Sequence, residues 1–445
     1  MRFRQQGAAL LATLALITLF GLYLFVKGLN ATQLNSMRQS NASVAMNAAR
    51  QALIAEALSP VMISNAGFLP LPDRGTNLVS GAWVAAEGLA SQNFLGNSKD
   101  RSLIGKFPWD SLNTGVLRDA AGNCLWYVVS GRFKVTPRSD AVNWDTLGQI
   151  DVINASGTLV ATNLAALVIA PGRTLPEQNR SLSNAAYREC GGNYDARQYL
   201  DPYLTAQTIN GQANYFSSGE VAPDTGNKTF VLADNASYND RLDFVQVDDI
   251  FNPLIKRNDF ALLVSLMLDH FKAKNDAIKL ENDAIDRRNQ GKIAQNLINA
   301  AAGQPLLPLE PLLPRTIIAG PKGTDNLGCP PEDSTLSIPL PTFCKNWKEM
   351  LFLTELPTAT PIEIVSVVTG VNQNVETCGR VLIFAGRRSA TQIRLTAADR
   401  SNKQNYLESP NNTSFAVPVA SSTSFKGFDN FVADNASADV MRCLL

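Results

Sequence analysis

Histidine is nearly absent from this 445-residue chain, in which His270 is the only one. A Ser-His-Asp or Cys-His triad needs a histidine as its base, and His270 lies in a helical segment away from any nucleophile motif. No G-x-S-x-G elbow, Walker A motif, G-x-G-x-x-G loop or H-E-x-x-H pair occurs. The sequence therefore argues against an enzyme. A carboxylate pair for glycoside hydrolysis has no sequence signature and stays open.

The chain also lacks net charge, because 39 basic residues balance 39 acidic ones. Without a basic field we expect no nucleic-acid partner. Only 18% of the residues are charged, and Asn, Ser, Thr and Gln replace them, as is common in exported proteins. The sequence has no C-x-x-C pair, which together with the single histidine argues against a metal site.

Cysteine is sparse but even in number, with six residues. An even set is typical of disulfides formed in an oxidising compartment, although some could be ordinary buried thiols. We expect Cys329–Cys344, because the four prolines between them make a stiff, irregular loop. Cys378–Cys443 would then tie down the C-terminal strand, and Cys124–Cys190 would staple the first half.

The N-terminus combines a basic leader with a long apolar run. Arg2 and Arg4 precede Gly7, and residues 8–26 carry no charge. A run of about 20 apolar residues can cross a bilayer as a helix, and the basic leader would hold the N-terminus in the cytoplasm. A cleaved signal peptide is the alternative, but no A-x-A site follows the run. We therefore expect a transmembrane helix over 8–26.

This arrangement resembles the class III signal of type IV pilins and type II secretion pseudopilins. The resemblance implies that a prepilin peptidase cuts between Gly7 and Ala8, and that the helix then packs among other pilin or pseudopilin subunits. It also implies an inner-membrane protein with a single span and a periplasmic or filament-borne head. Ala12 stands where major pilins carry Glu, which favours a tip or accessory subunit over a major fibre subunit.

The resemblance continues beyond the apolar run. Residues 27–60 are rich in Ala and Gln and predict the soluble half of a long first helix. Four motifs then follow in the order found in a little-characterised family of long, minor-pilin-like proteins. They are GFLPLPDRG (67–75), IGKFPWDSL (104–112), LRDAAGNCLWYVVSG (117–131) and LVIAPGR (167–173).

An internal repeat relates the two halves of the chain. Residues 168–180 align with 382–394, and further matches follow at Tyr199 and Tyr406 and at the Ala-Asp-Asn-Ala-Ser boxes of 233–237 and 433–437. The aligned pairs are Gly172/Gly386, Arg173/Arg387, Gln178/Gln392 and Arg180/Arg394. Two copies are too few for a solenoid, so we expect two related β-rich lobes.

Each copy predicts a buried strand followed by a glycine turn. We expect the paired Arg and Gln side chains to hydrogen-bond loop carbonyls, because a guanidinium has five donors in a rigid fork. Each Ala-Asp-Asn-Ala-Ser box is most simply a turn. It also places a carboxylate among oxygen ligands, so Ca²⁺ is an alternative there, and we expect no other cofactor.

A helical pattern and a proline-rich stretch separate the lobes. The apolar stretch 260–271 is much shorter than a bilayer span, so it predicts a packed core helix. Residues 304–315 carry repeated prolines and predict an extended, polyproline-like connector.

These patterns predict an α+β protein in which a long N-terminal helix, half membrane-spanning and half soluble, precedes two β-rich lobes with a helical insertion. The expected segments are 1–7 leader, 8–26 transmembrane helix, 27–60 soluble helix, 61–250 first lobe, 251–315 insertion and linker, and 316–445 second lobe. We expect a non-catalytic, minor-pilin-like subunit acting at a filament tip or as an adhesin. The alternatives are a solitary membrane-anchored periplasmic binding protein and a carboxylate-based hydrolase.

Overall fold

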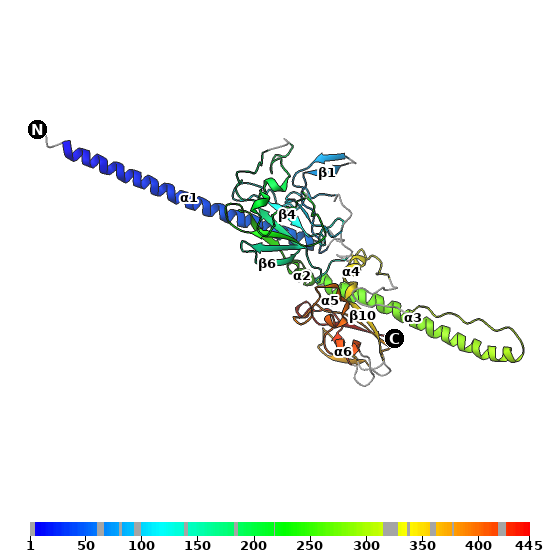
Figure 1. The fold of residues 1–445 in the computed structure, drawn as a ribbon. Helices are drawn as coiled ribbons and strands as arrows, with labels where there is room; N and C mark the ends of the chain where they lie inside the picture. The colour runs from blue at the N-terminus through cyan, green and yellow to red at the C-terminus, as the bar shows by residue number, and fades with distance from the viewer. Residues whose placement is uncertain are drawn as a thin grey trace. The chain divides into compact units, whose positions relative to one another are not determined.

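The computed structural model describes residues 5–59, 66–79, 82–92, 99–137, 141–181, 186–217, 219–314, 328–335, 339–356, 362–375, 378–416 and 424–445. Two compact units make up the chain (Figure 1). The first comprises Met1–Glu56, Leu69–Arg138 and Gly148–Gln246. The second comprises Ala57–Phe68, Ser139–Leu147 and Val247–Leu445. Short segments from the first half of the sequence thus belong to the second unit.

A single long helix, α1 (Gln5–Leu58), begins the chain, and the expected cleavage position, Gly7 and Ala8, lies in its first turns. The expectation of a transmembrane half over 8–26 is wrong. In the described part of the chain, no helix combines the length and the apolar character that a bilayer crossing requires. The described apolar stretch, Leu10–Phe25, covers 16 residues, whereas a span needs about 20. Small and polar residues, including Thr13 and Thr18, dilute this stretch.

The first unit contains two main sheets. Its four-stranded antiparallel sheet has the order β3-β4-β7-β9, and its three-stranded sheet has the order β6-β5-β8, with β5 and β8 parallel. One apolar core joins both sheets, with Trp126, Leu167 and Phe230 among its buried members. The strands are β1 (Thr76–Val79), β2 (Ala82–Ala85), β3 (Leu103–Lys106), β4 (Trp126–Val129), β5 (Ile150–Asn154), β6 (Leu159–Leu164), β7 (Ala166–Ala170), β8 (Lys228–Leu232) and β9 (Arg241–Val245). The short 3₁₀ turns are η2 (Ala196–Gln198) and η3 (Thr205–Gln207).

The C-terminal part of α1 belongs to this unit and lies against its sheet. Ala42, Ala45, Ala49 and Leu53 are buried at helical spacing, so small side chains bring the helix close to its neighbours. Arg50 Nε donates to the Phe244 carbonyl of β9 at 3.0 Å. The described C-terminal part of the helix, from Ala42 onward, therefore packs on the lobe through a stripe of small side chains.

The second unit contains one six-stranded sheet, ordered β10-β13-β15-β14-β11-β12. Its strands are β10 (Leu351–Glu355), β11 (Ile362–Val365), β12 (Asn372–Val375), β13 (Arg380–Phe384), β14 (Phe425–Phe428) and β15 (Val440–Leu444). Its helices are α2 (Val247–Ile255), α3 (Asn258–Ala301), α4 (Leu340–Trp347), α5 (Ala397–Ser401) and α6 (Asn411–Ala416), with 3₁₀ turns η4 (Lys348–Met350), η5 (Lys403–Asn405) and η6 (Ala433–Asn435).

The two lobes share one strand topology. Taken in chain order, β10 to β15 pair with one another as β4 to β9 do: first with fourth, second with third, second with fifth and fourth with sixth. The second-with-fifth pair is parallel in both lobes, and the other three are antiparallel. One further parallel bridge, Phe428 to Val440, joins all six strands of the second lobe into one sheet. The repeated sequence thus corresponds to a repeated fold.

The repeat also includes a helix. Lys272 Nζ on α3 donates to the Cys443 carbonyl of β15 at 2.7 Å. Cys443 lies three residues into β15 just as Phe244 lies three residues into β9, and Phe244 accepts the bond from Arg50. Each unit is therefore a long helix packed on a β-rich lobe, although the two helix sequences share no motif.

The distal half of α3 pairs with the extended segment 305–314, which the sequence predicted to be polyproline-like. Three asparagines spaced seven residues apart on α3 each both donate to and accept from one backbone residue of that segment, over 2.6–3.2 Å. The three pairs are Asn282 with Leu313, Asn289 with Glu310 and Asn296 with Leu307. Seven helical residues rise about 10.5 Å and three polyproline residues about 9.3 Å, so the two repeats stay in register over this length.

Three disulfides staple the units, in the pairing expected from the sequence. Cys124–Cys190 lies in the first unit, and Cys329–Cys344 and Cys378–Cys443 lie in the second. The Cys378–Cys443 bond joins the approach to β13 to the neighbouring strand β15. All six cysteines of the chain form these disulfides.

Candidate binding site

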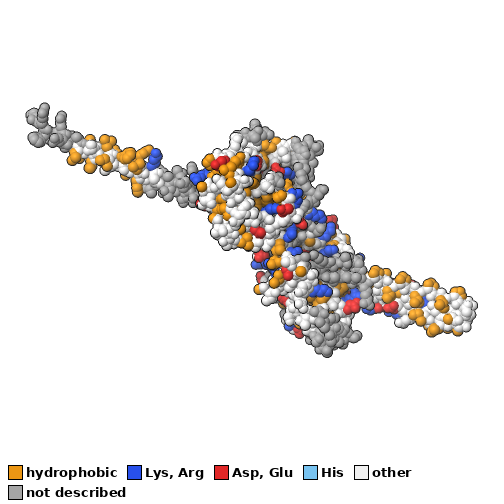
Figure 2. All heavy atoms as spheres, viewed as in Figure 1, with side chains coloured by type: hydrophobic (Ala, Val, Ile, Leu, Met, Phe, Trp, Pro, Cys, Tyr) orange, Lys and Arg blue, Asp and Glu red, His pale blue; other side chains and the backbone are white. Residues whose placement is uncertain are grey.

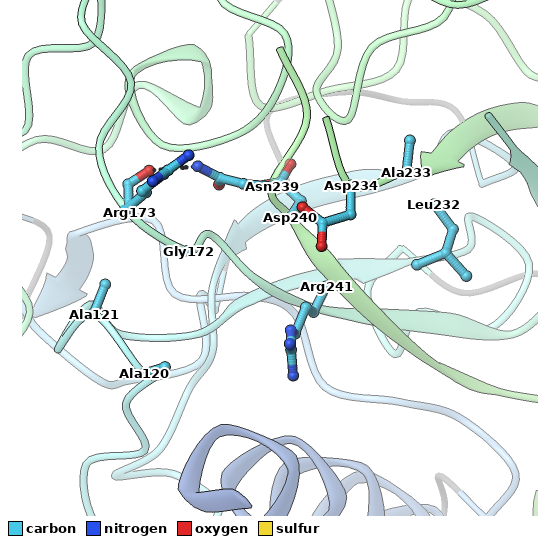
Figure 3. A pocket seen from close by; sticks show the side chains of 10 residues that line it. All are labelled: Ala120, Ala121, Gly172, Arg173, Leu232, Ala233, Asp234, Asn239, Asp240 and Arg241. Carbon is cyan, nitrogen blue, oxygen red and sulfur yellow. Dashed lines mark hydrogen bonds between the residues drawn. The ribbon is translucent and has the colours of Figure 1, made fainter. Parts of the chain in front are cut away.

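The first lobe has an open pocket of about 720 Å³ where β7 ends and β9 begins (Figure 3). Its lining includes Gly172 and Arg173 from the sequence repeat and residues beside the first Ala-Asp-Asn-Ala-Ser box. The lining residues are Ala120, Ala121, Gly172, Arg173, Leu232, Ala233, Asp234, Asn239, Asp240 and Arg241. The pocket is therefore built largely from the motifs that the two lobes have in common.

Gly172 shapes the turn that follows β7. Its φ of +68° lies in the left-handed region, where glycine is favoured. A Cβ at this position would lie 2.5 Å from Asn239 Oδ1 and 2.7 Å from the Asn239 carbonyl oxygen. The glycine thus permits a close approach to the segment before β9, and in the second lobe Gly386 approaches the Ser437 carbonyl in a similar way.

Arg180 stabilises this turn by donating to loop carbonyls, which is the contact expected from the sequence. Its guanidinium donates to the Gly172 carbonyl at 2.8 Å and to the Tyr199 carbonyl at 2.9 Å. It also donates to Gln178 Oε1 at 2.6 Å, and the same Gln178 oxygen accepts the Leu175 N–H. The Arg180 guanidinium is thus fully engaged in binding its own loop.

Arg394 repeats these contacts in the second lobe. It donates to the Gly386 carbonyl at 3.1 Å, to Gln392 Oε1 at 3.2 Å and to the Tyr406 carbonyl at 3.4 Å. One contact is new, an ion pair of 2.7 Å with Asp145 in which both side chains are almost fully buried. The four aligned pairs of the repeat thus divide into structural residues and the arginines Arg173 and Arg387, which follow the glycines.

A second set of repeated polar residues went unnoticed in the sequence. Asn214 accepts from the Val231 N–H and donates to the Val231 carbonyl and to Asp240 Oδ2. In the second lobe Asn411 bonds Lys426 and Asp439 in the same manner. Extending the Ala-Asp-Asn-Ala-Ser alignment with a one-residue gap would have paired Asp240 with Asp439. The asparagines lie in dissimilar sequence, and only the fold relates them.

Burial raises the pKa of the carboxyls beside the pocket and of the equivalent carboxyl in the second lobe. Burial raises the pKa of Asp201 to about 6, against hydrogen bonds from the Asn239 and Asp240 N–H groups and the charge of Arg180. Burial and the neighbouring Asp201 charge raise the pKa of Asp240 well above its usual value. In the second lobe burial raises the pKa of Asp439 to about 7. These carboxyls mainly receive backbone donors, so they hold the turns together.

Three charged side chains at the mouth of the pocket are exposed and uncommitted. Within the described residues, Arg173, Arg241 and Asp234 have no side-chain hydrogen bond or ion pair. Asn239 Nδ2 donates to the Arg173 carbonyl, which fixes the backbone that carries that guanidinium (Figure 3). Asn239 Oδ1 and Asp240 Oδ1 are buried and have no hydrogen-bond partner in the described structure. The pocket thus offers two cations to a ligand at its open mouth.

The second lobe lacks such a vacancy at the equivalent arginine. Arg387 donates to Asp248 and to Asn252, which lie four residues apart on α2. Its backbone N–H also donates to the Ala436 carbonyl at 2.7 Å. The position equivalent to Arg241 is Val440, which is buried. Arg387 is thus bound by side chains of its own chain, whereas Arg173 faces solvent.

The alternative of a Ca²⁺ loop at the boxes gains no support from the geometry. Asn235 Oδ1 accepts the N–H groups of Ser237 and Tyr238, so the box forms the expected turn. Among the described residues no group of three or more His, Cys, Asp and Glu side chains is arranged to hold a metal ion. Calcium binding stays an untested alternative.

His270 lies on α3 and contacts the Phe271 ring edge-on. Burial and the charge of Lys274 lower its pKa. It belongs to the second unit, whereas the residues that line the pocket belong to the first.

The N-terminal part of α1 is the second candidate functional surface. Eleven large apolar side chains between Leu10 and Phe25 are 53–73% exposed (Figure 2). They are Leu10, Leu11, Leu14, Leu16, Ile17, Leu19, Phe20, Leu22, Tyr23, Leu24 and Phe25. Because they occupy all sides of the helix, no single face of another domain would cover them.

Comparison with known proteins finds no matching family model, no matching curated protein and no matching solved structure. The likeness to pilins therefore rests on the sequence motifs alone and stays a prediction.

Proposed function

We propose that this protein is a non-catalytic, pilin-like subunit that joins a filament or secretion assembly through α1. The observation that carries the proposal is the apolar part of α1, which is exposed on every side. An all-round apolar helix needs several neighbours, and a bundle of equivalent helices from other subunits supplies them. The proposal includes cleavage after Gly7 by a prepilin peptidase and places the two lobes in the periplasm or on the filament.

Two further observations support this proposal. Three disulfides suit an oxidising compartment such as the periplasm. Each unit packs a long helix on a β-rich lobe, so the chain is a tandem of one helix-and-sheet module. A double head is bulky to repeat along a fibre, which favours a place at the tip or a role as an adhesin.

The test is N-terminal sequencing and intact mass of the full chain, produced with and without a prepilin peptidase. We expect a chain that begins at Ala8 only when the peptidase is present. Gly7→Val should block the cut, because the resemblance places the cut directly after this glycine. Gly21→Val is the matched control, since Gly21 lies on the same helix with open space around it.

A chain that is never cut would overturn the proposal and leave the solitary binding protein. Co-purification with other pilin-like subunits gives a second readout. Leu16→Asp should abolish it, because the substitution places a charge within the apolar stretch, whereas a solitary protein would show no such loss.

The hydrolase alternative requires two carboxyls that act on one substrate. Asp240 lines the pocket with a raised pKa, but its Oδ2 already accepts from Asp201 N and Asn214 Nδ2. The neighbouring carboxyl, Asp201, itself accepts the Asn239 and Asp240 N–H groups, so both carboxyls are engaged by the protein and we favour binding at this pocket over catalysis.

A further inference from the structure

The internal repeat provides a comparison between two copies of one site within the same chain. Arg173 and Arg387 stand at equivalent positions, one residue after the turn glycine of each lobe. Arg387 binds a carboxylate and a carboxamide, Asp248 and Asn252, which lie one turn apart on α2. The motif thus binds a pair of polar groups that a helix presents at i and i+4.

The described part of the first unit has no counterpart of α2. In the second unit the helical conformation is interrupted at residues 256–257, so α2 forms a separate short helix before α3. In the first unit α1 runs without interruption from Gln5 to Leu58. The element that binds Arg387 in one unit is therefore missing from the other, and Arg173 stays open within the described residues.

We propose that the pocket at Arg173 binds an acidic residue carried on a helix of another protein chain. The occupant presents a carboxylate to Arg173, as Asp248 does to Arg387, and an uncharged polar side chain one turn away. This inference does not depend on the pilin-like function, because it rests only on the repeat and the pocket.

The chemistry of the lining matches such an occupant. A guanidinium binds a carboxylate with two parallel N–H donors, and Arg241 adds a second cation where the other lobe has Val440. The polar group one turn away can accept from the same guanidinium, as Asn252 Oδ1 accepts from Arg387 in the second lobe. Asp234 adds a negative charge to the lining, which disfavours a run of several acidic residues.

The size of the pocket also suits side chains on a helix. The volume of about 720 Å³ holds several side chains, and the opening lies at the surface. The Arg387 contact in the second unit is partly exposed, with 26% of the Arg387 side chain accessible. We therefore expect modest, salt-sensitive affinity from the corresponding contact at Arg173.

The test measures binding of a fluorescent helical peptide to the full, disulfide-bonded chain by anisotropy. The probe is an acetylated, amidated, Ala-rich peptide of about 16 residues with Asp and Asn at i and i+4. We expect saturable binding that weakens by about tenfold or more in Arg173→Gln, since a charge-assisted hydrogen bond is lost. Arg188→Gln is the matched control, because Arg188 is an exposed arginine of the same unit outside the pocket lining.

A second peptide, with Asn in place of its Asp, should bind about tenfold more weakly to the unaltered chain and equally weakly to Arg173→Gln. The unaltered chain and the Arg173→Gln variant should fold alike, because the Arg173 side chain has no partner in the described structure. Absence of saturable binding to the unaltered chain, or equal loss in Arg188→Gln, would overturn the proposal. Equal binding of both peptides would overturn it too, since recognition would then not involve the carboxylate.

Discussion

At the scale of single residues, the repeat assigns different tasks to two arginines that lie close together in the sequence. Arg180 and Arg394 are bound on several sides by carbonyls of their own loops, so they are structural. Arg173 and Arg387 project from the same turn and contact other elements or solvent. The sequence motif does not distinguish the two arginines of each lobe. The hydrogen bonds do, because Arg387 binds α2 and only Arg173 is left without a described partner.

The buried pair of Asp145 and Arg394 should be critical for the second unit. Asp145→Ala would leave a buried guanidinium without its counter-charge, which costs about 3–5 kcal/mol of unfolding free energy. Urea denaturation followed by tryptophan fluorescence measures this loss, and Trp144 reports on it from the adjacent position. Asp286→Ala on the exposed face of α3 is the control, and a similar loss there would show that the ion pair has no special role.

Asp439 should make stability depend on pH. The folded carboxyl keeps its proton up to about pH 7, because burial raises its pKa, whereas the unfolded carboxyl loses its proton near the ordinary aspartate pKa of 3.8. The folded state thus binds more protons between these values, and this contribution to stability falls as the pH rises through that window. Asp439→Asn removes the titration, so its Tm should fall less than that of the unaltered chain between pH 4 and pH 8.

Calorimetry at several pH values checks this prediction. Asp286→Asn controls for the change in net charge. Parallel Tm profiles for Asp439→Asn and the unaltered chain would contradict the assigned role of burial.

At the scale of elements, the distal half of α3 and the extended segment 305–314 show how the repeat lengths of a helix and of a polyproline-like segment can match. Asparagines at every seventh position of the helix form hydrogen bonds with every third residue of the extended segment. The sequence predicted both elements but treated the strand as a linker. It folds back on the helix instead, because the amides of Asn282, Asn289 and Asn296 satisfy backbone groups that an isolated polyproline strand leaves to water.

The central asparagine should hold the helix and this segment together. Asn289→Ala removes both bonds to Glu310 and should release the middle of segment 305–314 at a cost of about 1–3 kcal/mol. Hydrogen exchange of peptides from 304–314 measures the release as faster exchange. Gln290→Ala is the matched control, because Gln290 is exposed on the next helical position. Unchanged exchange in Asn289→Ala would contradict this role and mean that the ion pairs of Glu310 with Arg288 and Lys292 hold the segment without the asparagine.

At the scale of the whole molecule, duplication explains the order of the strands better than any local pattern. Six strands in each lobe follow the same pairing scheme, and each lobe has its own helix and disulfide support. The helices could not be matched from sequence, because packing on a sheet requires only an apolar stripe and one donor to β9 or β15. Many sequences meet that requirement.

The disulfides should act locally within this architecture. Replacing Cys124 and Cys190 by serine opens a loop of 66 residues and should cost the first unit about 4 kcal/mol. Hydrogen exchange should rise in β4 and β7, while β13 and β15 keep the rates of the unaltered chain. An equal rise in both sets of strands would contradict local stabilisation and indicate that the two units unfold as one.

The sequence by itself determined the features that depend on local composition and spacing. The C-terminal part of α1, the long helix α3, the extended proline-rich segment and the disulfide pairing near Pro330 and Pro339 follow from propensity and chain stiffness. The repeat of Gly172 and Gly386 also determined that two lobes are related. The expectation of a transmembrane helix over 8–26 was wrong, because the described apolar stretch of 16 residues is shorter than the roughly 20 that a span needs.

Only the tertiary structure decided which of the repeated residues are free. Arg173 and Arg387 have the same local sequence context, but α2 covers one and no described element covers the other. Segment 141–147 likewise enters the second unit, where Trp144 and Asp145 meet residues more than two hundred positions away. Such contacts depend on the path of the whole chain, which brings a buried charge to its distant partner. A short window of sequence does not encode that path.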